Sequence, residues 1–111
     1  MKIKIATDFS RIPCARFLSE GDFPGEEFRE KILVPKLKEA IEKREKLEID
    51  LDGTAGLGTS FLEESFGGLI RIDRLKYEEI LNTIELISKD DPDYISEIYE
   101  YIKEANEKEN H

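Results

Sequence analysis

The sequence predicts an α/β domain with one small sheet and helices packed mainly on one face of it. Apolar and charged residues alternate over Met1–Ala6 and over Leu47–Asp52, and an apolar, β-branched run covers Thr83–Ser88. Alternation with a period of two is typical of a strand that is buried on one face only. Apolar residues at helical spacing separate the three segments, and strands joined through helices run parallel in one sheet.

The N-terminal strand carries two lysines that alternate with two isoleucines. If it pairs beside Leu47–Leu51, its lysines share the solvent face with Glu48 and Asp50. Opposite charges across strands stabilise a pairing by roughly 0.2–1 kcal/mol each. A short segment, Ala15–Leu18, is a candidate for an additional edge strand.

The first long helix is predicted to begin at Pro24-Gly25-Glu26-Glu27, because carboxylates in a first turn complement the helix dipole. Helical spacing continues to about Arg44. Pro35 lies inside this pattern, and an interior proline costs ~3 kcal/mol, so we expect a kink or a break there. The apolar residues of this stripe are Phe28, Ile32, Leu33, Leu37, Ala40 and Ile41.

A glycine-rich turn follows the central strand and leads into a second helix. Gly53, Gly56 and Gly58 allow a tight turn. Ser60 and Glu63 have the spacing of a capping box, whereas Thr59 has no assigned structural role. A strand–turn–helix junction directs backbone N–H groups beyond the strand end, and we therefore expect the functional surface here. The predicted helix stripe consists of Phe61, Leu62, Ser65, Phe66, Leu69 and Ile70.

The C-terminal part predicts one or two helical turns at Tyr77–Leu81, the third strand and a final helix. Asp91 is placed to cap this helix and Pro92 to occupy its first position. Its buried stripe is predicted to be Ile95, Ile98, Ile102 and Ala105, and residues 105–111 are expected to fray.

Composition excludes several classes of function. The chain has 111 residues and a net charge of −9, which fits a single domain and disfavours binding to nucleic acid and to anionic membranes. No apolar run approaches the roughly 20 residues of a membrane span. A single cysteine, Cys14, allows no internal disulfide and fits a reducing, cytoplasmic compartment.

Catalytic arrangements are weakly represented. The only histidine is His111, no Cys or His pair has metal-ligand spacing, and the sequence indicates no cofactor. The turn from Gly53 to Ser60 has the spacing of a phosphate-binding loop, but Thr59 stands where that motif requires lysine. An anion- or nucleotide-binding domain, or an enzyme using turn 53–60, is therefore the alternative to a binding module.

The segments DLDG (50–53) and GTSFL (58–62) resemble the strand–loop–helix of STAS domains, the anti-sigma factor antagonist fold. A closer resemblance, to a STAS-like bacterial family of unknown function, extends over nearly the full chain through GEEFR (25–29), DLDG and SFLEESFGGL (60–69). It implies a single STAS-like domain over residues 1–111. In the antagonists a serine at the helix start is phosphorylated by a partner kinase. The resemblance places Thr59 on that serine and Ser60 on the next one.

We therefore expect a protein-binding or regulatory module, possessing no catalytic residues and switched by phosphorylation at the turn. The partner implied is a histidine-kinase-like ATPase or an anti-sigma-type regulator. Paired glycines in a helix cost about 1 kcal/mol each and indicate a close approach, either by the first helix or by a partner. The predicted binding and regulatory residues are Gly53, Gly56, Gly58, Thr59, Ser60, Glu63, Gly67 and Gly68, supported by Asp50, Asp52, Arg16 and Arg29.

Overall fold

The computed structural model describes residues 1–13 and 24–110. Three parallel strands, β1 (Lys2–Lys4), β2 (Leu47–Asp50) and β3 (Ile84–Ile87), form one sheet in the order β1-β2-β3. All three predicted strands are therefore present in the same sheet. The predicted edge strand at Ala15–Leu18 lies outside the described residues.

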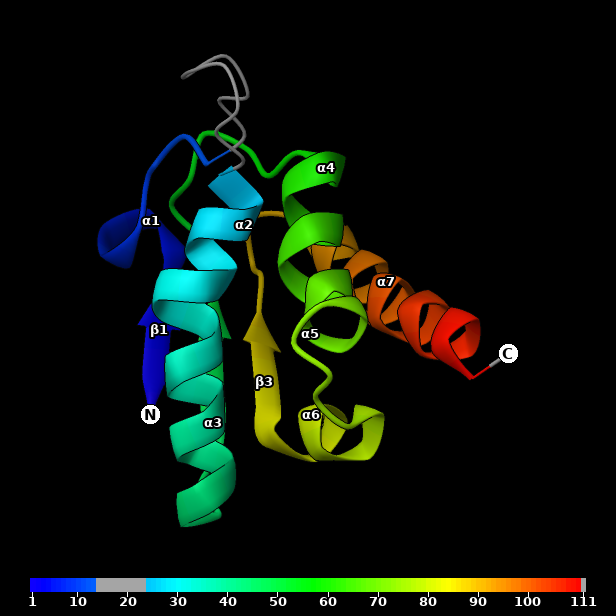
Figure 1. Ribbon diagram of the computed structural model, residues 1–111. Helices are drawn as coiled ribbons and strands as arrows, with labels where there is room; N and C mark the ends of the chain where they lie inside the picture. Colours follow the sequence, from blue (N-terminus) through cyan, green and yellow to red (C-terminus); the bar gives the residue numbers. More distant parts are fainter. Residues whose placement is uncertain (14–23, 111) are drawn as a thin grey trace.

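Two long helices cover one face of this sheet, as predicted (Figure 1). The first consists of α2 (Pro24–Phe28), η1 (Arg29–Leu33) and α3 (Val34–Lys43), and the second of α4 (Thr59–Leu62), η2 (Glu63–Gly67) and α5 (Gly68–Arg71). The remaining helices are α1 (Ile5–Asp8), α6 (Tyr77–Thr83) and α7 (Asp93–Glu109). Of these, α7 packs against η2 and α5.

The register of the sheet confirms the predicted charge pairing. Lys2 lies opposite Glu48 and Lys4 opposite Asp50, with Nζ-to-carboxylate distances of 3.3 and 3.7 Å. The alternate residues of the strands, among them Ile3 and Ile49, are fully buried under the helices. One face of the sheet is thus apolar and packed, and the other is charged and partly exposed.

The N-terminal strand is shorter than predicted. It ends at Lys4, and Ile5–Asp8 forms a helical turn. The carboxylate of Asp8 accepts the Lys4 N–H at 2.8 Å, and Lys36 Nζ donates to the Lys2 carbonyl at 3.2 Å. These side chains occupy backbone groups of β1, the edge strand of the sheet, where a further strand would otherwise pair.

Both long helices contain a five-residue π-helical segment, η1 and η2. Along both helices, pairs of adjacent residues that are buried or half-buried recur every four residues, a spacing wider than the 3.6 residues of an α-helical turn. A π turn is wider than an α turn and brings such a pattern back into phase with the core. The pairs are 28/29, 32/33, 36/37 and 40/41 in the first helix and 61/62, 65/66 and 69/70 in the second.

The π segment of the first helix ends at Leu33, two residues before Pro35. The Val34 N–H donates to the Arg29 carbonyl, an interval of five residues. The predicted break at Pro35 is not found, because η1 continues directly into α3, whose first turn holds the proline that has no N–H.

The C-terminal helix begins one residue later than predicted and extends further. Pro92 occupies the N-cap and Asp93 is the first helical residue, and the Asp91 carboxylate accepts the Asp93 N–H at 3.1 Å. The helix is intact to Glu109, Ala105 is buried, and Glu109 pairs with Arg74 at 3.1 Å. The helix therefore does not end at 105, where fraying was expected to begin. No helix in the described parts of the chain is long and apolar enough to cross a membrane.

Candidate functional site

The turn after β2 is fastened to the loop between β3 and α7. The Asp50 carboxylate accepts the Asp52 N–H at 2.9 Å, and one oxygen of Asp52 accepts the N–H groups of Lys89 and Asp90, both at 2.8 Å. Gly53 follows with φ of 90°, a left-handed conformation that favours glycine. Asp50 and Asp52 thus shape the turn, and their carboxylates are engaged in holding it.

Three backbone N–H groups of the glycine turn already have partners. Gly53 donates to the Asp90 carboxylate at 3.1 Å, Ala55 to the carbonyl of Arg11 at 2.7 Å, and Leu57 to the Tyr94 hydroxyl at 3.1 Å. An anion cradle requires such groups to converge on a ligand. The geometry therefore disfavours the anion-binding alternative for turn 53–60.

The second helix starts two residues earlier than the predicted cap at Ser60 implies. Gly58 occupies the N-cap, no side chain caps the helix, and Thr59 is its first residue. The predicted capping box is wrong: Ser60 lies within the first turn, and the Glu63 carboxylate pairs with Arg71 at 2.7 Å instead. Thr59 and Ser60 are both exposed.

The hydroxyl of Thr59 has an acidic, aromatic environment. Tyr101 of α7 lies beside it. Burial raises the pKa of Tyr101 and the charge of Glu97 raises it further, while the neighbouring Thr59 hydroxyl acts in the opposite direction. Glu63 and Glu104 also raise this pKa. Carboxylates of α7 and of η2 thus act on the Tyr101 hydroxyl beside the start of α4.

Arg29 is buried between the two long helices, away from turn 53–60. Its side chain is 1% exposed, and Nη1 donates to the Glu64 carbonyl at 2.8 Å and to the Glu64 carboxylate at 2.7 Å. On its other side Nε lies 2.9 Å from Asp73 Oδ2, an ion pair without hydrogen-bond geometry. Arg29 thus joins η1 to η2 and to the turn after α5.

Two glycines make this helix contact close. A Cβ atom at Gly25 would lie 2.9 Å from both the Phe61 carbonyl oxygen and the Glu64 Cβ, and one at Gly68 would meet the guanidinium of Arg29. Gly67 differs, because its added Cβ would meet chiefly the carboxylate of Glu63, at the end of a side chain of its own helix. The paired glycines, Gly67 and Gly68, were predicted to allow a close approach. The first helix makes this approach, and it does so at Gly68.

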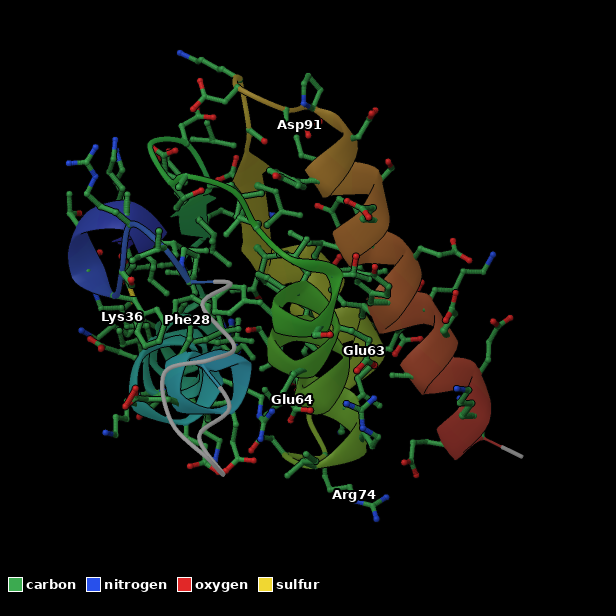
Figure 2. All side chains as sticks on the ribbon, turned by 90° about the horizontal axis from the view of Figure 1, so that it is seen from above. Phe28, Lys36, Glu63, Glu64, Arg74 and Asp91 are labelled. Carbon is green, nitrogen blue, oxygen red and sulfur yellow. The ribbon has the colours of Figure 1, made fainter. Side chains whose placement is uncertain are left out.

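Seen from above, the second helix lies between α2–α3 and α7 (Figure 2). Its buried stripe packs inward, Glu64 meets the first helix through Arg29, and Thr59 meets α7 through Tyr101. The region that the sequence singled out is therefore a scaffold of three helices with an exposed tip at Thr59 and Ser60.

A family model described as a STAS-like domain of unknown function matches residues 24–94. The chain belongs to this family. No curated protein and no solved structure matches it. In this STAS-like domain the three quoted segments, GEEFR, DLDG and SFLEESFGG, all lie within the matched region, and most of their side chains hold helices and loops together.

Several residues that shape the site escaped sequence reasoning, namely Arg11, Asp73, Asp90, Tyr94 and Tyr101. Each of these residues lies far along the sequence from the residue that it contacts. Arg16 and Cys14 lie outside the described residues. Within residues 1–13 and 24–110, no group of three or more His, Cys, Asp or Glu side chains could hold a metal ion.

Proposed function

We propose that this STAS-like domain is a protein-binding, regulatory module that docks through the exposed start of α4 and the adjoining turn. The carrying observation is that Thr59 and Ser60 are exposed and provide no helix cap, although they open a helix whose next ten residues are mostly buried. Two hydroxyls without a capping role at the tip of a rigid helix suit contact with a partner.

Phosphorylation of Thr59 is the proposed switch, and a histidine-kinase-like ATPase or anti-sigma-type regulator is the proposed partner. A phosphate would add about −1.5 to −2 charge at the N-terminus of the helix, where the dipole favours it. The nearby carboxylates of Glu63, Glu97 and Glu104 oppose it. Because these effects act in opposite directions, the added charge should alter the partner contact more than the fold.

The test compares Thr59→Glu with Asn82→Glu. Both variants add one negative charge at an exposed position, but α4 and α6 lie at opposite ends of the molecule (Figure 1). We expect both to keep the melting temperature within about 2–4 °C of the parent. Proteins retained by the immobilised parent chain in extracts of its source cells are then quantified for each variant. A retained protein should be lost with Thr59→Glu and kept with Asn82→Glu, whereas equal retention would contradict the proposal.

A further inference from the structure

We infer that α2 sets the position of the exposed start of α4, with Gly25 and Arg29 as the positioning residues. This inference rests on the proposed function, since the start of α4 is the docking surface proposed above. It adds a second element, remote from Thr59 in the sequence, on which the geometry of that surface depends.

The first contact is between backbones. With no side chain at Gly25, the backbone of α2 lies directly over the Phe61 carbonyl and the Glu64 Cβ. The Ser65 hydroxyl donates to the Gly25 carbonyl at 3.3 Å and fixes the same crossing. Phe61 is two residues after Thr59, so this contact bears on the first turn of α4.

The second contact lies one turn further along both helices. Where the bonding pattern of a helix changes from five-residue to four-residue intervals, one carbonyl is left without a backbone donor. Within η2, Arg29 Nη1 donates to the Glu64 carbonyl and also pairs with its carboxylate. The guanidinium therefore holds the wide turn of the second helix as well as the helix pair.

A chain of ion pairs leads from this contact toward the surface. Glu64 lies 3.8 Å from Arg71, and Arg71 holds Glu63 at 2.7 Å. Glu63 is four residues after Thr59 and so lies on the same side of the helix. On the opposite flank, Tyr101 of α7 meets Thr59. The start of α4 is thus held between α2 and α7, and a displacement of α2 must change its orientation.

Gly25→Ala and a remote control separate this role from general stability. In Gly25→Ala the new methyl group meets backbone and a Cβ, which cannot move aside, so α2 must shift. In the control, Asn82→Ala, an exposed side chain of α6 is shortened, and α6 lies at the opposite end of the molecule from α4 (Figure 1). Arg29→Lys serves as a third variant that keeps the charge but loses the planar fork.

The readout is amide hydrogen exchange and amide chemical shifts in the free protein. For Gly25→Ala and Arg29→Lys we expect shifted signals of Thr59 and Ser60, and exchange of the Leu62–Glu64 amides faster by about tenfold or more. Exchange in β2 should stay at the parent rate. Asn82→Ala should reproduce the parent spectrum around Thr59.

The inference is overturned if Arg29→Lys, or a folded Gly25→Ala, leaves the Thr59 and Ser60 signals and the Leu62–Glu64 exchange unchanged. It is equally overturned if exchange rises uniformly in β2 and α4, because that result reports a global loss of stability. If Gly25→Ala does not fold, Arg29→Lys decides. No partner takes part in this measurement, so its failure is distinguishable from failure of the Thr59→Glu comparison.

Discussion

The guanidinium of Arg29 occupies the space in which a side chain at Gly68 would begin. A Cβ at position 68 would lie 2.9 Å from Arg29 Cζ and 3.0 Å from Cδ, and closer still to Nη1. The arginine cannot move aside, because Glu64 and Asp73 hold it from two directions in a fully buried position. Glycine at 68 is thus a consequence of arginine at 29.

This relationship predicts strong coupling between the two positions. Gly68→Ala alone should lower the free energy of unfolding by about 1–3 kcal/mol, because it overpacks a closed site. In an Arg29→Ala background the same change should be neutral or stabilising, since alanine exceeds glycine in helix propensity by about 1 kcal/mol. A urea-unfolding double-mutant cycle measures the difference, with Arg29→Lys as the background if Arg29→Ala does not fold. Additive effects would show that the two residues do not compete for space.

The sequence predicted the sheet and the course of the chain because those depend on local patterns. Alternation located β1 and β2, and the opposite charges of Lys2 and Glu48 favoured the pairing that the structure shows. Burial of Arg29 could not be predicted in this way, because its partners lie 35 and 44 residues further along the chain. Arg29 follows Glu26 by three residues, and this spacing is equally typical of an ion pair on an exposed helix face.

The π segments had a readable signal that escaped the sequence reasoning. The pairs 61/62, 65/66 and 69/70, apolar except for Ser65, repeat at intervals of four, which neither a regular α-helix nor a heptad pattern keeps in phase. The start of α4 had no comparable signal. Thr59 and Ser60 are both suited to a cap, yet Gly58 occupies the N-cap and neither side chain caps the helix.

Removing the Ser60 hydroxyl, which was predicted to cap the second helix, should therefore change the stability of the fold little. Ser60→Ala should change the free energy of unfolding by less than about 0.5 kcal/mol, because Ser60 is exposed and caps nothing. Asp91→Ala should cost about 1 kcal/mol, since the Asp91 carboxylate accepts the Asp93 N–H at the start of α7. Chemical denaturation of the two variants side by side checks the contrast. A larger loss for Ser60→Ala than for Asp91→Ala would reverse the assignment.

Arg44 ends α3 in the left-handed conformation, with φ of 58°. The Glu45 N–H donates to the Ala40 carbonyl at 2.9 Å, the closing bond of a helix C-cap in which glycine is the favoured residue. We expect Arg44→Gly to raise the free energy of unfolding by about 0.5–1 kcal/mol, as strain is relieved and chain entropy partly offsets the gain. A lower melting temperature would mean that the Arg44 side chain stabilises the fold.

Two tyrosines of α7, Tyr99 and Tyr101, should lose their protons at a higher pH than a free tyrosine. Burial raises the pKa of Tyr99 and of Tyr101, with further contributions from Glu85 and Glu97 respectively. A raised folded-state pKa gives stability that is present below the unfolded value of about 10 and is lost as pH rises through the folded value. Absorbance titration at alkaline pH should show an upper phase that Tyr99→Phe and Tyr101→Phe each reduce. A single phase at the free-tyrosine value would contradict this.

The central claim, that the start of α4 is the docking surface, is tested most directly by site-specific photocrosslinking in the source cells. A benzophenone amino acid is placed at Thr59 in one variant and at Asn82, at the far end of the molecule, in the other (Figure 1). Both variants must retain the parent melting temperature. The account predicts a discrete crosslinked protein from position 59 that is absent from position 82. The same products from both positions, or none from position 59, would contradict it.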